Sequence, residues 1–225
     1  MTLRPAVRLY QDRGNTIVTG PADEPVTAEE LWAHLRTDET DFPDALDYIT
    51  AARTHIETAT NVAMVTQTVR MTIDHWPNGA EAWWDGVRQF PISEIYGANS
   101  MTSVQLPRWP LASIVSVTTY DEDGTATVID VTNTFDVDTY SNPGRLTLKR
   151  GAVWPSSMRS NNAIQIIYTA GHGAQPCEVP MMYKQAVKQL AAYMYEHRGD
   201  NCSSGDAYHA SGAASILNVY KAARI

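Results

Sequence analysis

Cysteine is scarce in this chain, and the patterns in which it usually serves chemistry are missing. The 225 residues include two cysteines, Cys177 and Cys202, which lie far apart. One such pair does not make a disulfide framework, and no CxxC motif is present to hold zinc. This usage favours a reducing compartment such as the cytoplasm.

Long hydrophobic runs and clusters of basic residues are missing too. No stretch approaches the roughly 20 apolar residues of a membrane-spanning helix, and "MTLRPAVRLYQDRGN" lacks the apolar segment of a secretory signal. The 17 Lys and Arg residues are outnumbered by 25 Asp and Glu residues, so the net charge is −8. Proteins that grip phosphate backbones cluster their cations. We therefore expect an acidic surface that lets DNA pass without binding it.

Catalytic signatures are also absent. The sequence has no GxSxG, Walker or GxGxxG motif, and no histidine belongs to an HxH or HxxxH pair. His172, flanked by glycines in "TAGHGAQP", is the best candidate for a general base, but no partner is signalled, which favours a simple turn after a strand. An enzyme with a site around His172, Asp74 and His75 stays as an alternative. We expect no cofactor and no metal, since "DEDG" lacks the closing Glu of a calcium loop.

Helical patterns occur at both ends of the sequence. Thr27, with Glu30 three residues later, is typical of a capping box and predicts a helix over residues 27–36. Apolar residues at helical spacing predict a second helix over 43–60, in which Pro43 suits the first helical position. A third is predicted over 179–198, between Pro180 and Gly199. The apolar face of the second helix would consist of Ala45, Tyr48, Ile49, Ala52, Ile56 and Ala59.

Between these helices, over residues 65–170, the spacing changes to that of strands. In "TQTVRMTIDHW", Val69, Met71 and Ile73 alternate with polar residues, which predicts a half-buried strand. "ASIVSVTTY", "TATVIDV", "TFDVDTY", "GRLTLKRG" and "NAIQIIYTAG" predict further strands, with turns at "DEDG" and "SNPG". Segregated runs of helices and strands indicate an α+β fold.

Two further features suggest interaction surfaces. Tryptophans such as Trp83, Trp84 and Trp109 fit a protein interface, because aromatic residues are enriched there; a place in the core is the alternative. The other feature is the apolar-sided "ASILNVYKAARI", which follows the linker "DNCSSGDAYHASGA". So short a helix is marginal alone in water. We expect it to fold by docking, either on its own core or in a partner's groove.

The ordered set of these segments resembles the head–tail connector, or adaptor, proteins of long-tailed double-stranded DNA phages, prophages and related gene-transfer particles. The resemblance runs from "VTGPADEPVTAEELWAHLR" to "VPMMYKQAVKQLAAYMYEHRG", with "LPRWPL" and "GRLTLKRGAVWP" as its most specific parts. It divides the chain into a flexible N-terminus (1–15), a connector core (16–199) and a linker with a docking segment (200–225). It implies a small helical bundle, of two N-terminal helices and a long C-terminal helix, with an inserted antiparallel β element.

The resemblance also implies a structural role in the virion. Such proteins form a ring, typically dodecameric, under the portal, where it extends the DNA channel and provides the platform for the tail. The implied partners are further copies of the chain, the portal protein and a tail-completion or stopper protein, with assembly in the bacterial host cytoplasm. A tail-completion or terminator ring protein is the alternative. The implied portal-docking residues are Ile216, Leu217, Tyr220 and Arg224, and the implied ring or tail interface consists of Trp83, Trp84, Arg108 and Trp109.

Overall fold

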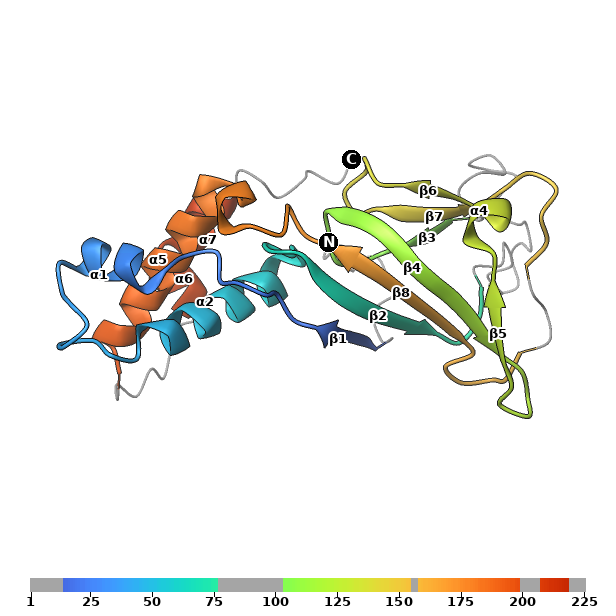
Figure 1. Ribbon diagram of the computed structural model, residues 1–225, viewed down its shortest axis with the longest axis horizontal. Helices are drawn as coiled ribbons and strands as arrows, with labels where there is room; N and C mark the ends of the chain where they lie inside the picture. Colours follow the sequence, from blue (N-terminus) through green and yellow to red (C-terminus); the bar gives the residue numbers. More distant parts are fainter. Residues whose placement is uncertain (1–13, 77–102, 155–157, 199–206, 219–225) are drawn as a thin grey trace, which may run out of the picture.

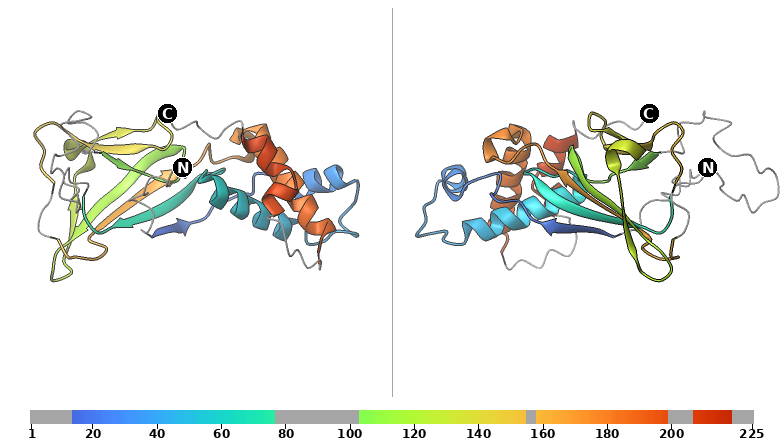
Figure 2. Two further views of the ribbon diagram at one scale, coloured as in Figure 1. Left: turned by 180° about the vertical axis from the view of Figure 1, so that it is seen from behind. Right: turned by 45° about the vertical axis from the view of Figure 1, so that its right-hand side comes forward.

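The computed structural model describes residues 14–76, 103–154, 158–198 and 207–218. The molecule is elongated, with helices gathered at one end and strands at the other (Figures 1 and 2). This arrangement confirms the predicted α+β class and the β element inserted between N-terminal and C-terminal helices. The helices of this end are α1 (Ala28–Leu35), α2 (Ala45–Thr60), α5 (Met181–Glu196), α6 (Ala207–Ala210) and α7 (Ala213–Leu217).

Local signals in the sequence explain where the helices begin. The side chain of Thr27 caps α1, because its Oγ1 accepts a hydrogen bond from the backbone N–H of Glu30 at 3.2 Å. The Glu30 carboxylate extends to α5, where it lies 3.7 Å from Nζ of Lys184. Helix α2 begins at Ala45 after the N-cap Asp44, so Pro43 precedes the helix and does not occupy its first position as predicted. The predicted apolar face is buried except for the half-buried Tyr48 and the exposed Ala59.

Two antiparallel sheets form the other end of the molecule. A five-stranded sheet has the order β1-β2-β8-β4-β5, and a three-stranded sheet has the order β3-β7-β6. The short helix α4 (Val131–Thr134) precedes β6. The strands are β1 (Asn15–Thr19), β2 (Gln67–Ile73), β3 (Ser103–Gln105), β4 (Leu111–Tyr120), β5 (Ala126–Ile129), β6 (Phe135–Asp138), β7 (Arg145–Leu148) and β8 (Ile164–Ala170).

The sheets enclose a hydrophobic core of their own. Val69, Met71 and Ile73 alternate with exposed or half-buried residues along β2, as predicted, and point into this core. The three-stranded sheet contributes Val104 and Leu146 from the other side. In the predicted turn between β4 and β5, Gly124 has a φ of +82°, a conformation that glycine adopts without strain.

A second core fills the helical end, and its composition settles how the C-terminal segment packs over residues 207–218. Tyr208, Ala213, Ala214 and Leu217 are buried in this core together with residues of α1, α2 and α5. Of the two outcomes left open by the sequence, docking on the chain's own core is the one observed for this stretch. The reason is burial, because these apolar side chains cover α5 and lose their contact with water.

Candidate functional site

The two ends meet at a junction that is organised around one buried carboxylate. The side chain of Glu57, in the last turns of α2, is 1% exposed. One of its oxygens accepts hydrogen bonds from Met64 N at 2.8 Å and Gln67 Nε2 at 3.2 Å. The other lies 3.0 Å from Nη1 of Arg53 and 3.5 Å from Nη1 of Arg108. A single side chain thus joins α2, the start of β2 and the β3–β4 connection.

Arg53 extends this network towards the N-terminal segment. Its guanidinium holds the Glu24 carboxylate through Nε at 2.7 Å and Nη2 at 3.1 Å, in the two-pronged geometry that makes such pairs strong. Burial alone would lower the pKa of Arg53, but hydrogen bonds and charges from Glu24 and Glu57 outweigh it and raise that pKa. Two carboxylates and two guanidinium groups therefore balance at the junction, which is what a buried ionic cluster requires.

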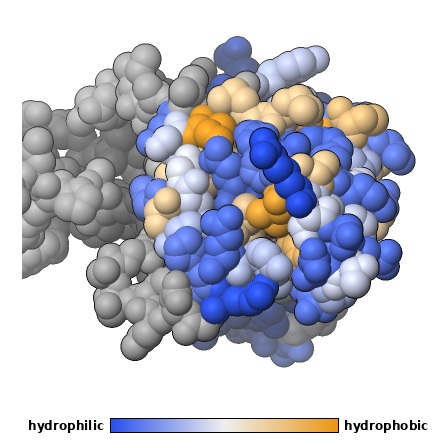
Figure 3. Space-filling view, turned by 90° about the vertical axis from the view of Figure 1, so that its left-hand side faces the viewer, coloured by the Kyte–Doolittle hydropathy of each residue, from blue (hydrophilic) through white to orange (hydrophobic). Residues whose placement is uncertain are grey.

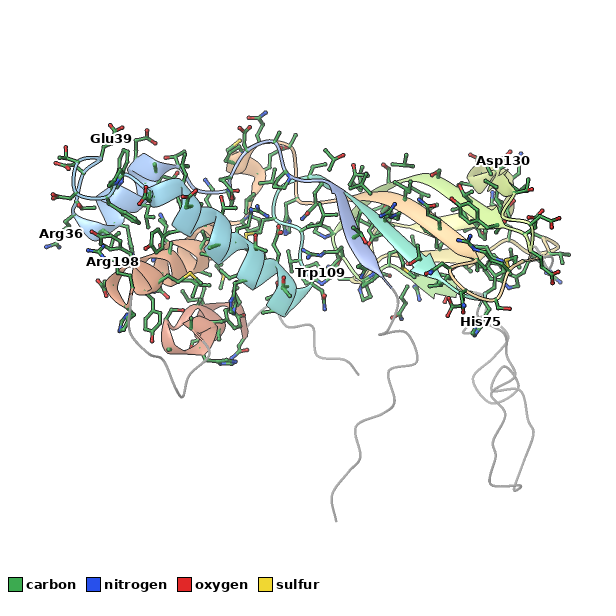
Figure 4. All side chains as sticks on the ribbon, turned by 90° about the horizontal axis from the view of Figure 1, so that it is seen from below. Arg36, Glu39, His75, Trp109, Asp130 and Arg198 are labelled. Carbon is green, nitrogen blue, oxygen red and sulfur yellow. The ribbon has the colours of Figure 1, made fainter. Side chains whose placement is uncertain are left out.

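Arg108 and Trp109, predicted at a ring or tail interface, lie at this junction. The Arg108 side chain is 14% exposed and pairs with Glu57. The Trp109 backbone N–H donates to Asn61 O at 3.1 Å, and its carbonyl accepts from Ala63 N at 2.8 Å. Figure 4 shows Trp109 between the helical end and the sheets. These residues join the two ends of one chain, which the sequence did not indicate, and a contact of their exposed parts with another copy stays a prediction.

The other predicted interface residues divide between the core and the undescribed part of the chain. Leu217 is 1% exposed and belongs to the helical core, and Ile216 is partly buried against it. Leu217 is therefore engaged within its own chain and is not a free docking residue in this conformation. The remaining predicted positions, Trp83, Trp84, Tyr220 and Arg224, lie outside the described residues.

The residues of the enzyme alternative do not come together. Strands β2 and β8 are antiparallel neighbours, so the end of one lies beside the start of the other. His172 follows β8 at the helical end of this pair. Asp74 and His75 follow β2 at the opposite end of the pair. The length of such a seven-residue strand separates them, roughly 20 Å. The His172 ring lies 5.5 Å from the Tyr183 ring, and burial lowers its pKa. Asp74 accepts a hydrogen bond from Asn162 N at 2.7 Å.

Neither a metal-binding cluster nor a membrane-spanning helix is found among the described residues. In that part of the chain, no group of three or more His, Cys, Asp and Glu side chains is placed to hold a metal ion. None of the helices described there combines the length and hydropathy needed to cross a membrane.

Acidic residues concentrate in the N-terminal half of the helical end. From residue 23 to residue 57 the sequence has ten Asp and Glu residues and two Arg residues, a net charge of −10 + 2 = −8 that equals the charge of the whole chain. The outer face of this end is mostly hydrophilic (Figure 3), and Arg36 and Glu39 lie at its tip (Figure 4). A surface of this charge repels nucleic-acid phosphates.

Comparison with known proteins identifies the fold. No family model matches the sequence, and no curated protein matches it. Three solved chains are 22% identical to it and match 94% of its length: one in the neck of an empty gene transfer agent (GTA) particle solved with C6 symmetry (TM-score 0.70), one in the virion of a native GTA particle (0.68), and one in the neck of a native GTA particle solved with C12 symmetry (0.66). The matches cover 97%, 96% and 97% of those chains. The resemblance to connector-type proteins of phage-like particles is thus confirmed at the level of the fold.

Proposed function

We propose that this protein is a structural component of the neck of a phage or gene-transfer particle. Its copies form a ring under the portal, with twelve as the expected number, since one of the similar chains belongs to a neck of C12 symmetry. The ring extends the DNA channel and carries the platform on which the tail is completed. Its further partners are the portal protein and a tail-completion or stopper protein.

The observation that carries this proposal is the match over nearly the whole of a neck chain. The match includes both ends of the molecule, because 94% of this chain aligns with 97% of that one. The acidic helical end supports the proposal, since a channel protein has to let DNA slide past without holding it. The separation of His172 from Asp74 and His75 removes the particular catalytic grouping that competed with it.

Electron microscopy of particles made without the gene tests the proposed role. We expect DNA-filled or emptied heads without tails, accompanied by separate tails, and recovery of tailed particles when the gene is supplied in trans. Tailed particles in normal yield without the gene would contradict the proposal. Heads that carry a complete neck, beside tails of uncontrolled length, would instead favour the terminator alternative.

Two truncations separate the fold of the C-terminal segment from its proposed docking on the portal. A chain that ends at Asn218 lacks Tyr220 and Arg224 but keeps the buried residues of α6 and α7. We expect it to melt like the full chain and to lose binding to purified portal rings in a co-sedimentation assay. A chain that ends at Arg198 also loses Tyr208 and Leu217 from the core. We expect its free energy of unfolding to fall by about 4 kcal/mol, because each large apolar side chain contributes ~2 kcal/mol on burial.

The docking proposal fails if the chain that ends at Asn218 binds portal rings as tightly as the full chain. The matching control is a full chain with Cys177→Ser. This residue is exposed and lies before α5, so the substitution should change neither melting nor portal binding.

A further inference from the structure

The loop between β6 and β7 is held rigidly by its own hydrogen bonds. The carboxylate of Asp138 accepts from Tyr140 N at 3.0 Å, from Ser141 N at 3.2 Å and from Ser141 Oγ at 2.7 Å. Arg145, on the other side of the loop, donates from Nε to the same carboxylate at 2.9 Å. Hydrogen bonds from Ser141 and then Arg145 lower the pKa of Asp138 to about 2, so these bonds persist at any physiological pH.

The base of the loop is fixed to the rest of the sheet end. Leu106 N donates to Gly144 O at 2.8 Å. A Cβ on Gly144 would lie 2.5 Å from Cβ of Leu111, so this loop residue packs tightly against the start of β4. The backbone around residue 140 is therefore set before any partner arrives.

Tyr140, at the tip of this loop, is 97% exposed. So complete an exposure is unusual for a large aromatic side chain on an otherwise braced loop. The loop reads Thr-Tyr-Ser-Asn-Pro-Gly from residue 139 to residue 144, a composition rich in the residues that dominate protein-binding loops. Rigid tyrosines make good interface anchors, because they bury much area and lose little conformational freedom.

A groove that could receive such an anchor lies along the outer side of α2. It is a shallow hollow, wide open to solvent, with a volume of about 700 Å³. Its described lining comes from α2 alone: Asp47, Thr50, Ala51, Thr54, His55, Thr58 and Ala59. The hydroxyls of Thr54 and Thr58 donate to carbonyls one turn earlier, each at 2.8 Å. These hydroxyls are thus satisfied within the helix, and the threonines can present their methyl groups to the groove. Among the described lining residues, the exposed Ala51 and these methyl groups give the floor an apolar character.

The loop and the groove lie on different sides of the molecule. The β6–β7 loop is on the upper side in Figure 1, whereas α2 is at the front in Figure 4, the view from below. A contact between them must therefore join two copies, and it pairs two different surfaces. Contacts of this kind close into rings when the rotation between copies permits, and similar chains belong to necks of C6 and C12 symmetry.

Charge also favours this pairing over a contact between two like surfaces. The groove is edged by Asp47 on a segment with a strong excess of acidic residues. The face beside the loop carries three cations, Arg145, Lys149 and Arg150, against two anions, Asp136 and Asp138. Arg145 pairs with Asp138 and Lys149 with Asp136, so the excess on this face is the single positive charge of Arg150. That charge is opposite in sign to Asp47 at the rim, and the aromatic anchor meets the apolar floor.

We propose that the β6–β7 loop of one copy inserts Tyr140 into the α2 groove of the next copy, as a lateral contact of the ring. This inference rests on the proposed ring and adds the surfaces that build it. It assigns Tyr140 as the donor anchor, and Ala51 and Thr54 as the floor that receives it.

Substitutions on each side of the contact test the inference in the full-length protein. Tyr140→Ala removes the anchor, and Ala51→Arg blocks the groove at an exposed position of a helix that tolerates arginine. We expect each variant to stay folded and to raise the concentration for half-assembly by about 30-fold or more, as loss of an interface hot spot does. Sedimentation velocity and native mass spectrometry measure the assembly. Tyr140→Phe and the exposed Leu46→Arg on the same helix are the matched controls and should assemble normally.

Mixing the two defective variants gives a sharper result. The Ala51→Arg chain retains Tyr140, and the Tyr140→Ala chain retains an open groove, so one intact contact can form between them. We expect one-to-one heterodimers that do not grow, while each variant alone stays monomeric. Rings that persist with Tyr140→Ala, or a mixture without heterodimers, overturn this inference and leave the proposed neck function standing. If wild-type protein forms no ring at any concentration, either alone or with portal rings present, both the lateral contact and the proposed ring function are overturned.

Discussion

Replacing Glu57 with alanine is expected to lower the free energy of unfolding by about 3–5 kcal/mol, the cost of breaking a buried ion pair from one side. The residue is 1% exposed, and its removal leaves Arg53 without one partner. It also leaves Arg108 without its carboxylate and Met64 N without an acceptor. Urea unfolding followed by circular dichroism measures the change. Because Glu57 joins both ends of the molecule, both should lose stability together.

Two comparisons make this prediction specific. Glu122→Ala removes the same group from the exposed turn between β4 and β5, and we expect a change within about 0.5 kcal/mol. Glu57→Gln preserves the shape of the side chain and the contact with Met64 N but removes the charge. Its loss in free energy of unfolding should therefore fall between the losses of Glu57→Ala and Glu122→Ala. A loss below about 1 kcal/mol for Glu57→Ala would show that the junction is held by packing and not by this carboxylate.

Replacing Gly171 with alanine is expected to destabilise the protein by about 3 kcal/mol, because strain and overpacking coincide there. The residue has a φ of +147°, and a Cβ on it would lie 2.5 Å from both Cα and N of Thr66. Its N–H donates to Pro110 O at 2.9 Å, so it cannot move aside without breaking that bond. Thermal and urea unfolding both measure the loss.

Other glycines provide graded controls for this substitution. A Cβ on Gly20 would meet nothing within 4 Å, and its φ is not positive, so Gly20→Ala should be neutral or slightly stabilising. Gly124 has open space but a φ of +82°, so Gly124→Ala should cost about 1 kcal/mol from the left-handed conformation alone. Equal losses at Gly124 and Gly171 would mean that the close approach to Thr66 contributes nothing.

The sequence predicts those parts of the fold that rest on local patterns. Val69, Met71 and Ile73 alternate within one strand, and Thr27 caps the helix that follows it. Each signal lies within a few residues, and each is confirmed. The turn at Gly124 belongs to the same group. The order of the strands could not be predicted in this way. Strand β8 lies between β2 and β4 through pairings that link residues about 50 to 100 positions apart in the sequence.

The sequence did not indicate the buried ionic cluster around Glu57 for the same physical reason. In "HIETATN", Glu57 looks like an ordinary solvent-facing residue of an amphipathic helix. Its spacing from Arg53 was the one local sign of a pair. The partner Arg108 is 51 residues away and becomes a neighbour only when the sheet forms. Likewise, nothing in the sequence links Tyr140 to the α2 groove. The exposure of Tyr140 and the hydrogen bonds that hold its loop are seen only in the folded chain.

The division of the helical core between the two ends of the sequence has a consequence for how the chain folds. Helix α2 ends at residue 60 and α5 begins at residue 181, so 120 residues (61–180) separate two helices that pack together. Closing so long a loop costs about 4 kcal/mol of chain entropy. Pairing of β2 with β8 brings the two helices together at its end near Gln67 and Ala170. The sheet should therefore form first and act as the template for the helices. On the ribosome, a nascent chain that stops short of α5 leaves exposed the part of α2 that packs against α5 in the folded protein.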